Sequence, residues 1–392
     1  RAFPISGTLA HPRLRFTPVA ANGEDTITLP AGYGWHVVAA WGDPLWSGVA
    51  QFDQQTRGTA ASQAMAFGDN CDGMAFFDID GHKLLAVNNE YCNRKIIYGN
   101  RESDLPENDE DVHKGMSAHG VSIFEIEQQD GQWRIRLDSP YNRRLTPTSR
   151  MEITGPARGH DLMKTAADPT GTRSFGTWNN CGNGITPWGT FLTCEENFNV
   201  CFSTPSQPEA GLSDTLKRYG IKNVDWGYDW SRVDERFDVA RHPNEPHRAG
   251  YIVEIDPARP QSTPRKRTAM GRFKHENCEV VVADNGHVVA YMGDDEWGEF
   301  IYRFVSTGKY IPGSGENRNL LEDGVLSVAR FEDDGSGRWI ELTPESTGMS
   351  REEICIFSRI AGSKVGATTM DRPEWVAANP YKAEAYCCLT NN

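Results

Sequence analysis

The sequence predicts an all-β protein with the architecture of a β-propeller. Its composition is the first reason, because 38 glycines and 11 tryptophans accompany an absence of long Leu, Ala, Glu and Lys runs, and such a composition favours strands and turns. The second reason is a strand-turn-strand pattern that recurs at intervals of roughly one hundred residues. Propeller blades are repeats of ~40–50 residues, so each interval would hold about two blades.

Each copy of the recurring pattern is an apolar strand that follows a turn and ends in polar residues. The four copies are 80–90, 188–197, 285–295 and 383–392. A polar loop leading into a short strand precedes each copy, at 69–73, 179–184, 274–278 and 371–375. Such a hairpin brings its loop and its far strand end to the same rim. Four rims arranged radially would converge on one axis, where propellers bind ligands.

Other strands and a few short helices fill the intervals. Alternating apolar and polar residues predict half-buried strands at 120–126, 249–256, 300–305 and 339–342. A long excursion at 202–248 carries a short helix near 213–219, a loop covers 313–323, and Ser350 is placed to cap a helix at 350–357. Insertions on one rim of a repeat fold shape its binding face, so we expect these segments on one rim.

The charge and the apolar runs exclude several classes of partner. The chain has 54 acidic and 40 basic residues, a net charge of −14, which argues against a nucleic-acid polymer and suits a protein that gathers cations. No run approaches ~18 apolar residues, so no membrane span is expected. The nine cysteines lack CxxC spacing and indicate neither a disulfide framework nor a zinc ribbon. Because the chain starts at Arg1 without a signal peptide, we expect a processed or trimmed chain.

Acidic side chains recur at equivalent places in the four copies. Strand ends supply Glu90, Glu195, Glu196, Asp294 and Asp295, and the loops add Cys181, Glu276 and Glu374. Any one of these acids alone is most simply a solvated surface group. Carboxylates that converge on one axis, however, repel one another unless cations neutralise them, and oxygen ligands of this kind suit calcium. Adjacent acids on a strand point to opposite sides, so the sequence leaves open which of each pair faces the axis.

Cys181 lies in a turn among Asn and Gly, whereas a purely structural cysteine would more often lie on an apolar strand. A thiolate is a soft ligand and selects a transition metal over calcium. We therefore expect a mixed site, with hard cations held by oxygens and at least one softer metal at Cys181. The alternative is a plain buried thiol, and spacing alone does not choose between the two.

Two basic side chains are candidates for contact with substrate. Arg372 lies two residues before Glu374, across Pro373, which favours an extended or turn segment. There its guanidinium could meet a phosphate with two hydrogen bonds. His275, beside Glu276, could bind substrate or a metal, or it could simply pack in the core. GxGxxG, Walker, HExxH and GxSxG motifs are absent, so Ser-His-Asp hydrolysis has no support.

At these residues the chain resembles the PhoX family of secreted, calcium-dependent alkaline phosphatases. The segments that carry the resemblance are 178–190 with 194–197, then 271–276, 291–295 and 371–375. The match runs over nearly the whole chain, and the segment around Cys181 is long enough to be specific.

The resemblance implies a six-bladed propeller and a cofactor of iron (Fe³⁺) and calcium ions bridged by an oxo group. It places the family's cysteine ligand on Cys181, its acidic ligands on several of the acids named above, and its phosphate-contacting arginine on Arg372. It also implies export in folded form by the twin-arginine route, hence a periplasmic or extracellular location. We expect one propeller domain over 1–392, with a closing segment of the family beyond Asn392.

The resulting prediction is a monomeric phosphomonoesterase that acts on small molecules, including nucleotides. The alternative enzyme is a propeller lactonase or phosphotriesterase that uses one calcium ion. The alternative without catalysis is a propeller binding module. The metal content separates these three possibilities, because only the first needs iron as well as several calcium ions.

Overall fold

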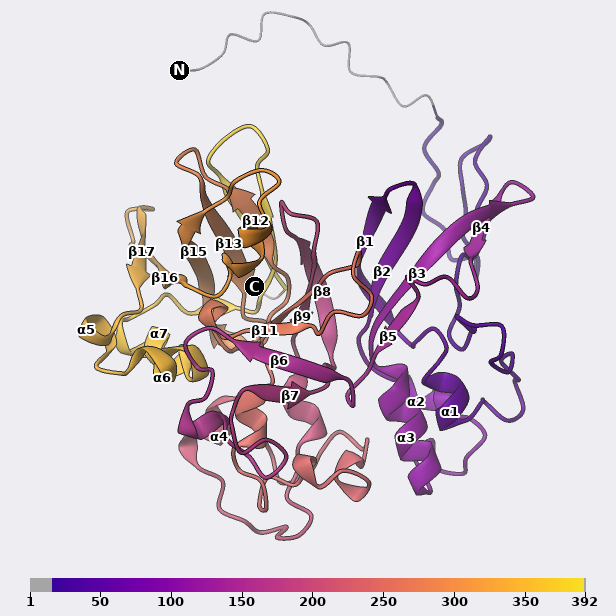
Figure 1. Ribbon diagram of the computed structural model, residues 1–392, viewed down its shortest axis with the longest axis horizontal. Helices are drawn as coiled ribbons and strands as arrows, with labels where there is room; N and C mark the ends of the chain where they lie inside the picture. Colours follow the sequence, from indigo (N-terminus) through magenta and orange to yellow (C-terminus); the bar gives the residue numbers. More distant parts are fainter. Residues whose placement is uncertain (1–15, 391–392) are drawn as a thin grey trace, which may run out of the picture.

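The computed structural model describes residues 16–390, which form strands in several sheets with a few short helices (Figure 1). The first large sheet has the order β1 (Cys71–Ile79), β2 (His82–Asn89), β3 (Gly120–Gln129) and β4 (Gln132–Ile135), and β5 (Arg143–Leu145) also pairs with β3. The second has the order β7 (Arg173–Phe175), β6 (Arg150–Thr154), β11 (Arg265–Arg267), β10 (Ile252–Ile255), β9 (Phe191–Glu195) and β8 (Asn180–Ile185).

The third large sheet is entirely antiparallel. Its order is β12 (Glu279–Val282), β13 (His287–Gly293), β15 (Ile301–Lys309), β16 (Gly324–Phe331) and β17 (Gly337–Glu341). Two small sheets complete the strands: β14 (Trp297–Glu299) with β18 (Met370–Asp371), and β19 (Pro373–Ala378) with β20 (Ala385–Leu389). The mostly-strand fold predicted from the sequence is therefore confirmed.

The four recurring hairpins are present as β1–β2, β8–β9, β12–β13 and β19–β20. The last two residues of the fourth copy, 391 and 392, lie outside the described residues. The first three hairpins each belong to one of the three large sheets, and the fourth forms a small sheet of its own. The count of six blades stays a prediction.

The remaining predicted strands are also confirmed, as β3, β10, β15 and β17. The α-helices are α1 (Ala60–Gln63), α2 (Arg94–Ile97), α3 (Asp109–Ala118), α4 (Asp214–Arg218), α5 (Pro344–Thr347), α6 (Arg351–Ile356) and α7 (Ser358–Lys364). Ser213 caps α4 and Ser350 caps α6 through a capping box, as their positions in the sequence predict. None of the helices in the described part of the chain has the length and apolarity that crossing a bilayer requires.

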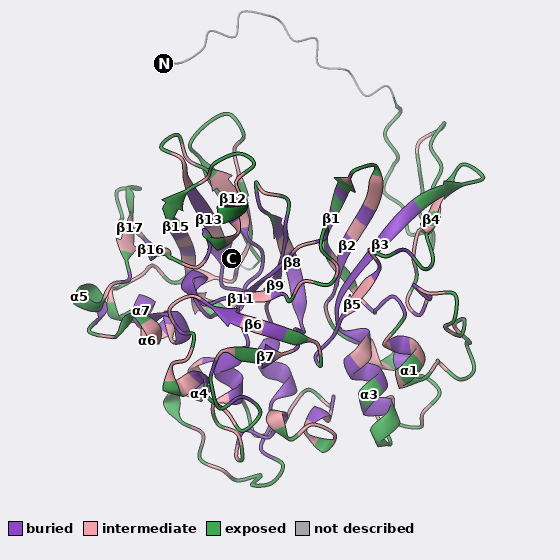
Figure 2. Ribbon diagram, viewed as in Figure 1, coloured by how far each residue is buried: buried purple, intermediate pink, exposed green. Residues whose placement is uncertain are grey.

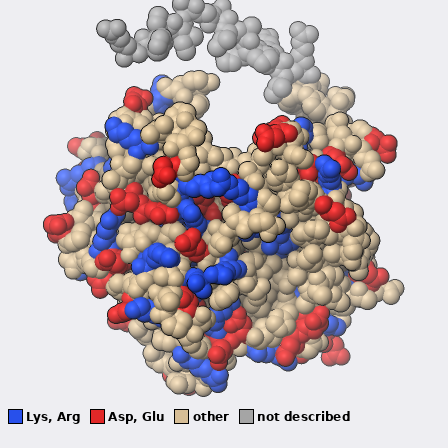
Figure 3. Space-filling view, in the orientation of Figure 1, with Lys and Arg blue, Asp and Glu red and all other residues tan. Residues whose placement is uncertain are grey.

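The core lies between neighbouring sheets, as Figure 2 shows by the buried strands at the middle of the molecule. Phe77 of β1 packs with Phe191 and Val253 of the second sheet, and Leu192 of the second sheet packs with Met292 of the third. In Figure 1, β8 and β9 stand between the β1–β2 and β12–β13 hairpins, and the helices lie below the sheets. Figure 3 shows acidic and basic side chains interspersed over this face, without a large patch of one sign.

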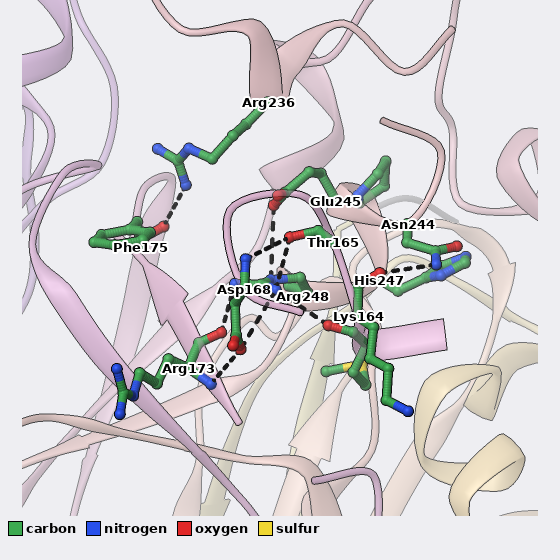
Figure 4. A network of polar contacts seen from close by, with 12 residues as sticks. Lys164, Thr165, Asp168, Arg173, Phe175, Arg236, Asn244, Glu245, His247 and Arg248 are labelled. Carbon is green, nitrogen blue, oxygen red and sulfur yellow. Dashed lines mark hydrogen bonds and ion pairs between the residues drawn. The ribbon is translucent and has the colours of Figure 1, made fainter. Parts of the chain in front are cut away.

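The excursion at 202–248 is fixed by a buried arginine at its end. Arg248 donates from Nη1 to the carbonyl oxygen of Met163 (3.1 Å) and to Oγ1 of Thr165 (3.0 Å), and it pairs with Asp168 and Glu245 (Figure 4). Its own carbonyl accepts a hydrogen bond from Nζ of Lys266 (2.8 Å). Buried charges of this kind need such partners, so the network anchors the excursion to the second sheet.

Candidate metal centre

The four hairpins close with the same backbone hydrogen bond, which places the residue after the outgoing strand beside the polar loop. The bonds run from Glu90 N to Asn70 O (2.9 Å), Glu196 N to Asn179 O (2.9 Å), Asp295 N to Lys274 O (3.0 Å) and Thr390 N to Arg372 O (3.3 Å). Three of the accepting residues, Asn70, Asn179 and Arg372, have positive φ of 43°, 48° and 60°. Non-glycine residues adopt this region at an energetic cost, and the cost is smaller for Asn than for Arg.

The loop residue that follows each acceptor by two positions is Asp72, Cys181, Glu276 or Glu374. In three hairpins the strand register shifts at this residue: between Cys71 and Met74, between Asn180 and Asn183, and between Pro373 and Val376. A β-bulge turns a side chain out of the alternating pattern. The bulges therefore aim Asp72, Cys181 and Glu374 away from their sheets.

Hydrogen bonds between hairpins hold these loops against one another. Nδ2 of Asn88 donates to the carbonyl oxygens of Cys181 (2.7 Å) and Gly182 (2.8 Å), and Gly182 N donates to the carbonyl oxygen of Glu276 (2.8 Å). Asn277 exchanges two bonds with the backbone of Val376, at 2.9 and 2.8 Å. The four loops consequently meet at one place.

Two groups of metal-ligating atoms result. Asp72, Glu90 and Cys181 place one ligand atom each within 4.8 Å of one another, and Glu276, Asp295 and Glu374 do the same. Cys181 joins the groups, because its Sγ lies 3.2 Å from Oδ2 of Asp72 and 3.3 Å from Oε2 of Glu276.

The acidic side chains of these two groups are costly to ionise unless cations are bound beside them. Burial and then the neighbouring carboxylate of Asp72 raise the pKa of Glu90 from 4.5 to about 8. Burial and then Glu374 raise the pKa of Glu276 to about 8, and burial raises the pKa of the Cys181 thiol. Glu196 is buried, and its Oε1 has no hydrogen-bond partner within 16–390. These are groups whose charged forms need bound cations, so the residues present fit a metal cluster.

The two members of each pair of adjacent acids lie in different environments. Glu195 pairs with Asn180 inside the β8–β9 ladder, and its fully buried carboxylate accepts hydrogen bonds from Lys266 Nζ (2.8 Å), Gly250 N (2.8 Å) and Tyr251 N (3.1 Å). Asp294 is buried in an ion pair with Arg359, with Nε 2.8 Å from Oδ2. Of the eight predicted metal ligands, these two carboxylates pair with fully buried basic groups and belong to neither ligand group, whereas Asp295 belongs to the second group although it pairs with Arg372.

Arg372 lies beside the second group. Its Nε and Nη2 donate to the two carboxylate oxygens of Asp295 (2.8 and 2.7 Å), and Nη2 also lies 3.2 Å from Oε1 of Glu374. These hydrogen bonds and charges raise the pKa of the guanidinium, which stays charged. The predicted turn at this arginine is present, and the guanidinium is held next to the candidate metal ligands.

His275 lies in the core. Its Nε2 is 3.0 Å from the carbonyl oxygen of Gly271, its ring stacks on Phe273 at 3.7 Å, and burial lowers its pKa to about 3. This placement gives no geometric support to a role for His275 in substrate binding.

Sequence reasoning did not single out Asp72. The signal was present, because Asp72 follows Asn70 by two positions, as Cys181 follows Asn179 and Glu374 follows Arg372. Aligning the four loops on these acceptor residues would have found it.

Comparison with known proteins agrees with this geometry. Residues 14–392 match the family described as alkaline phosphatase PhoX. The chain is similar to Pseudomonas fluorescens PhoX, solved in complex with vanadate, a transition state analogue: 46% sequence identity, TM-score 0.91, covering 96% of this chain and 68% of that one. A search of curated protein sequences gives no match.

These matches decide between the three functions that the sequence left open. Neither a lactonase or phosphotriesterase nor a binding module without catalysis accounts for a match over residues 14–392 to a phosphatase family. The same family match, with a phosphatase as structural neighbour, identifies the activity as hydrolysis of phosphate esters. The chain is a phosphatase and belongs to the alkaline phosphatase PhoX family.

Proposed function

We propose that the chain hydrolyses phosphomonoesters, nucleotides among them, with a cofactor of Fe³⁺ and calcium ions bridged by an oxo group. The side chains that would hold this cofactor are Asp72, Glu90, Cys181, Glu196, Glu276, Asp295 and Glu374. The observation that carries the proposal is the fourfold repeat of the hairpin closure, which delivers one loop residue and one strand-end residue per hairpin to the same place.

The donor set argues for two kinds of metal. Cys181 offers a soft sulfur ligand suited to iron, and Glu276 is the carboxylate whose Oε2 lies 3.3 Å from that sulfur. The other carboxylates are hard oxygen ligands suited to calcium. When bound, such ions polarise phosphoryl oxygens and stabilise the charge that develops in the transition state.

Arg372 would bind the phosphate of the substrate. Asp295 fixes the plane of the guanidinium through Nε and Nη2, which leaves Nη1 without a hydrogen bond to any described residue. A preorganised guanidinium stabilises developing negative charge without having to reorient during the reaction. Asp295 therefore orients Arg372 in addition to its proposed place among the ligands.

We further propose a single monomeric propeller domain over 1–392 that acts in the periplasm or outside the cell after twin-arginine export. Family membership supports an exported enzyme, and folded export is compatible with a cofactor acquired before transport. Fusion of the full-length precursor to a reporter that requires the twin-arginine route tests this location.

The experiment that tests the function is hydrolysis of a phosphomonoester combined with elemental analysis of the same protein sample. We expect iron and calcium in the purified protein, and loss of hydrolysis after exhaustive chelation that calcium restores where iron remains bound. Zinc as the sole metal, or full activity in protein shown to be free of metal, would contradict the proposal.

A further inference from the structure

A pocket of about 460 Å³ opens beside the candidate metal centre. It shares Glu90 with the first ligand group, and it is bordered by Asn179, two residues before Cys181, and by Asn197, one residue after Glu196. Its size lies within the range of ~300–1,000 Å³ that small-molecule sites occupy. The pocket and the candidate metal centre therefore share a wall at Glu90.

The walls of the pocket combine aromatic rings with basic groups. Tyr91 and Trp226 line it with exposed fractions of 40% and 53%, Tyr228 forms a buried wall, and Arg94 and Lys95 add two positive charges. Aromatic faces stack on planar rings, and guanidinium and ammonium groups donate to acceptor atoms. These walls suit a planar heterocycle with acceptor atoms better than an alkyl chain.

The indole of Trp226 is presented by a fixed backbone. Trp226 N donates to the carbonyl oxygen of Val200 (3.1 Å), and the Trp226 carbonyl accepts a hydrogen bond from Nη1 of Arg94 (2.6 Å). Tyr228, two residues on, packs edge-on against His119. The loop is therefore anchored on both sides while the indole itself remains exposed in the pocket.

We propose that this pocket binds the leaving group of the substrate, and that it selects nucleoside monophosphates by stacking the base on Trp226 and Tyr91. The proposal rests on the phosphatase function proposed above and specifies its substrate class. Arg94 and Lys95 would donate to acceptor atoms of the base or the ribose.

The test compares adenosine 5′-monophosphate with glycerol phosphate, which has no ring to stack. In Trp226→Ala, the ratio of kcat/KM for the nucleotide to kcat/KM for glycerol phosphate should fall about tenfold, since stacking of one base is worth ~1–3 kcal/mol and tenfold is ~1.4 kcal/mol. The loss should appear in KM, because the stack is present in the bound substrate and in the transition state alike. Trp226→Phe, which keeps an aromatic face, should retain most of the ratio.

Trp35→Ala is the matched control, because Trp35 is also 53% exposed and is not among the residues lining the pocket. It should leave the ratio at the wild-type value. A wild-type ratio in Trp226→Ala, or an equal loss for both substrates, would overturn the subsite.

Calorimetric titration with adenosine keeps this test independent of turnover. Adenosine binding that the wild type shows and Trp226→Ala lacks would support the subsite, whether or not the protein hydrolyses either ester. Failure to hydrolyse both esters would contradict only the proposed function. Absence of adenosine binding in the wild type would overturn the subsite.

Discussion

At the scale of single residues, Glu195 and Glu196 are neighbours in the sequence with different environments. Glu195 forms a fully buried ion pair with Lys266, and Glu196 carries a buried oxygen without a partner among the described residues and a pKa that burial raises well above its usual value. The carboxylate of Glu195 therefore supports the fold, whereas that of the adjacent Glu196 is available to a cation.

This difference predicts opposite effects for two equivalent substitutions. Glu195→Gln should destabilise the fold by ~3–5 kcal/mol, because it leaves the buried ammonium of Lys266 without its anion. Glu196→Gln should leave the metal-free protein at least as stable as the wild type, and it should lower the metal content of the purified protein. Denaturant unfolding of chelated samples and elemental analysis of untreated samples measure the two quantities, and the reverse pattern would contradict the assignment.

A substitution at Cys181 distinguishes a metal ligand from a buried structural thiol. Cys181→Ser should lose iron and any visible absorption from thiolate-to-metal charge transfer, because a hydroxyl is a far weaker ligand than a thiolate. Cys194→Ser, at a fully buried cysteine in the same hairpin, is the control and should keep both. Equal iron content and identical spectra in wild type and Cys181→Ser would remove the cysteine from the site.

Arg372→Lys should lower kcat on the order of a hundredfold although the charge is kept. An ammonium group cannot both donate two hydrogen bonds to the carboxylate of Asp295 and present a further donor in the same plane. Steady-state kinetics with one phosphomonoester measure this, with Arg338→Lys at a 60% exposed side chain as the control. Wild-type kinetics in Arg372→Lys would show that this arginine does not contact the substrate.

At the scale of the elements, the hairpin is the unit that carries the site. Its loop and its strand end are separated by 15 positions between Cys181 and Glu196 and by 19 between Glu276 and Asp295. One backbone hydrogen bond nevertheless brings them together. Thr390 takes the strand-end position in the fourth hairpin, and its hydroxyl hydrogen-bonds Oε1 of Glu374. The fourth hairpin thus uses a neutral side chain where the others use an acid.

Close approach between hairpins depends on Gly182. A Cβ on this residue would stand 2.3 Å from the carbonyl oxygen of Glu276, so Gly182→Ala should push apart the loops that carry Cys181 and Glu276. We expect a loss of ~1–3 kcal/mol in stability, as for other overpacked sites, together with reduced metal content. Gly211→Ala, where a Cβ has nothing within 4 Å, should change neither quantity; an unaltered Gly182→Ala protein would contradict this packing.

The sequence reveals the hairpins but not the register within them. Alternation and turn residues mark β1–β2 and its three counterparts, because side-chain period and turn chemistry are local properties. The bulges that aim Asp72 and Cys181 out of their strands arise from contacts with the next hairpin, such as the bond from Asn88 to the carbonyl of Cys181. The proposed choice of Glu196 over Glu195 as a ligand likewise rests on the pairing of Glu195 with Lys266, which lies 71 positions along the chain. No local pattern in the sequence reports that partner.

At the scale of the whole molecule, the carboxylates link stability to pH and to metal. The pKa of Glu90 and that of Glu276 are raised from 4.5 to about 8, so the metal-free folded chain binds more protons than the unfolded chain between these values. The contribution of these two carboxyls to the free energy of unfolding should therefore fall as pH rises from about 4.5 to about 8. Bound cations would replace those protons and remove the decline.

Thermal unfolding of chelated and metal-loaded protein at about pH 5, 6, 7 and 8 checks this linkage. The gap between the melting temperatures of the metal-loaded and the chelated protein should widen across the series, because the buried His119, His247 and His275 contribute equally to both samples. A gap that stays constant across the same interval would mean that these acids are not held in a desolvated cluster.

Our proposal places iron at Cys181, in a cluster held by the four converging hairpins. Anomalous difference maps from crystals of the protein, collected on both sides of the iron absorption edge, test it most directly. We expect iron density within bonding distance of Cys181 Sγ and the carboxylate of Glu276, with further cation density among Asp72, Glu90, Glu196, Asp295 and Glu374. Maps without iron density at Cys181, from crystals of active protein, would contradict it.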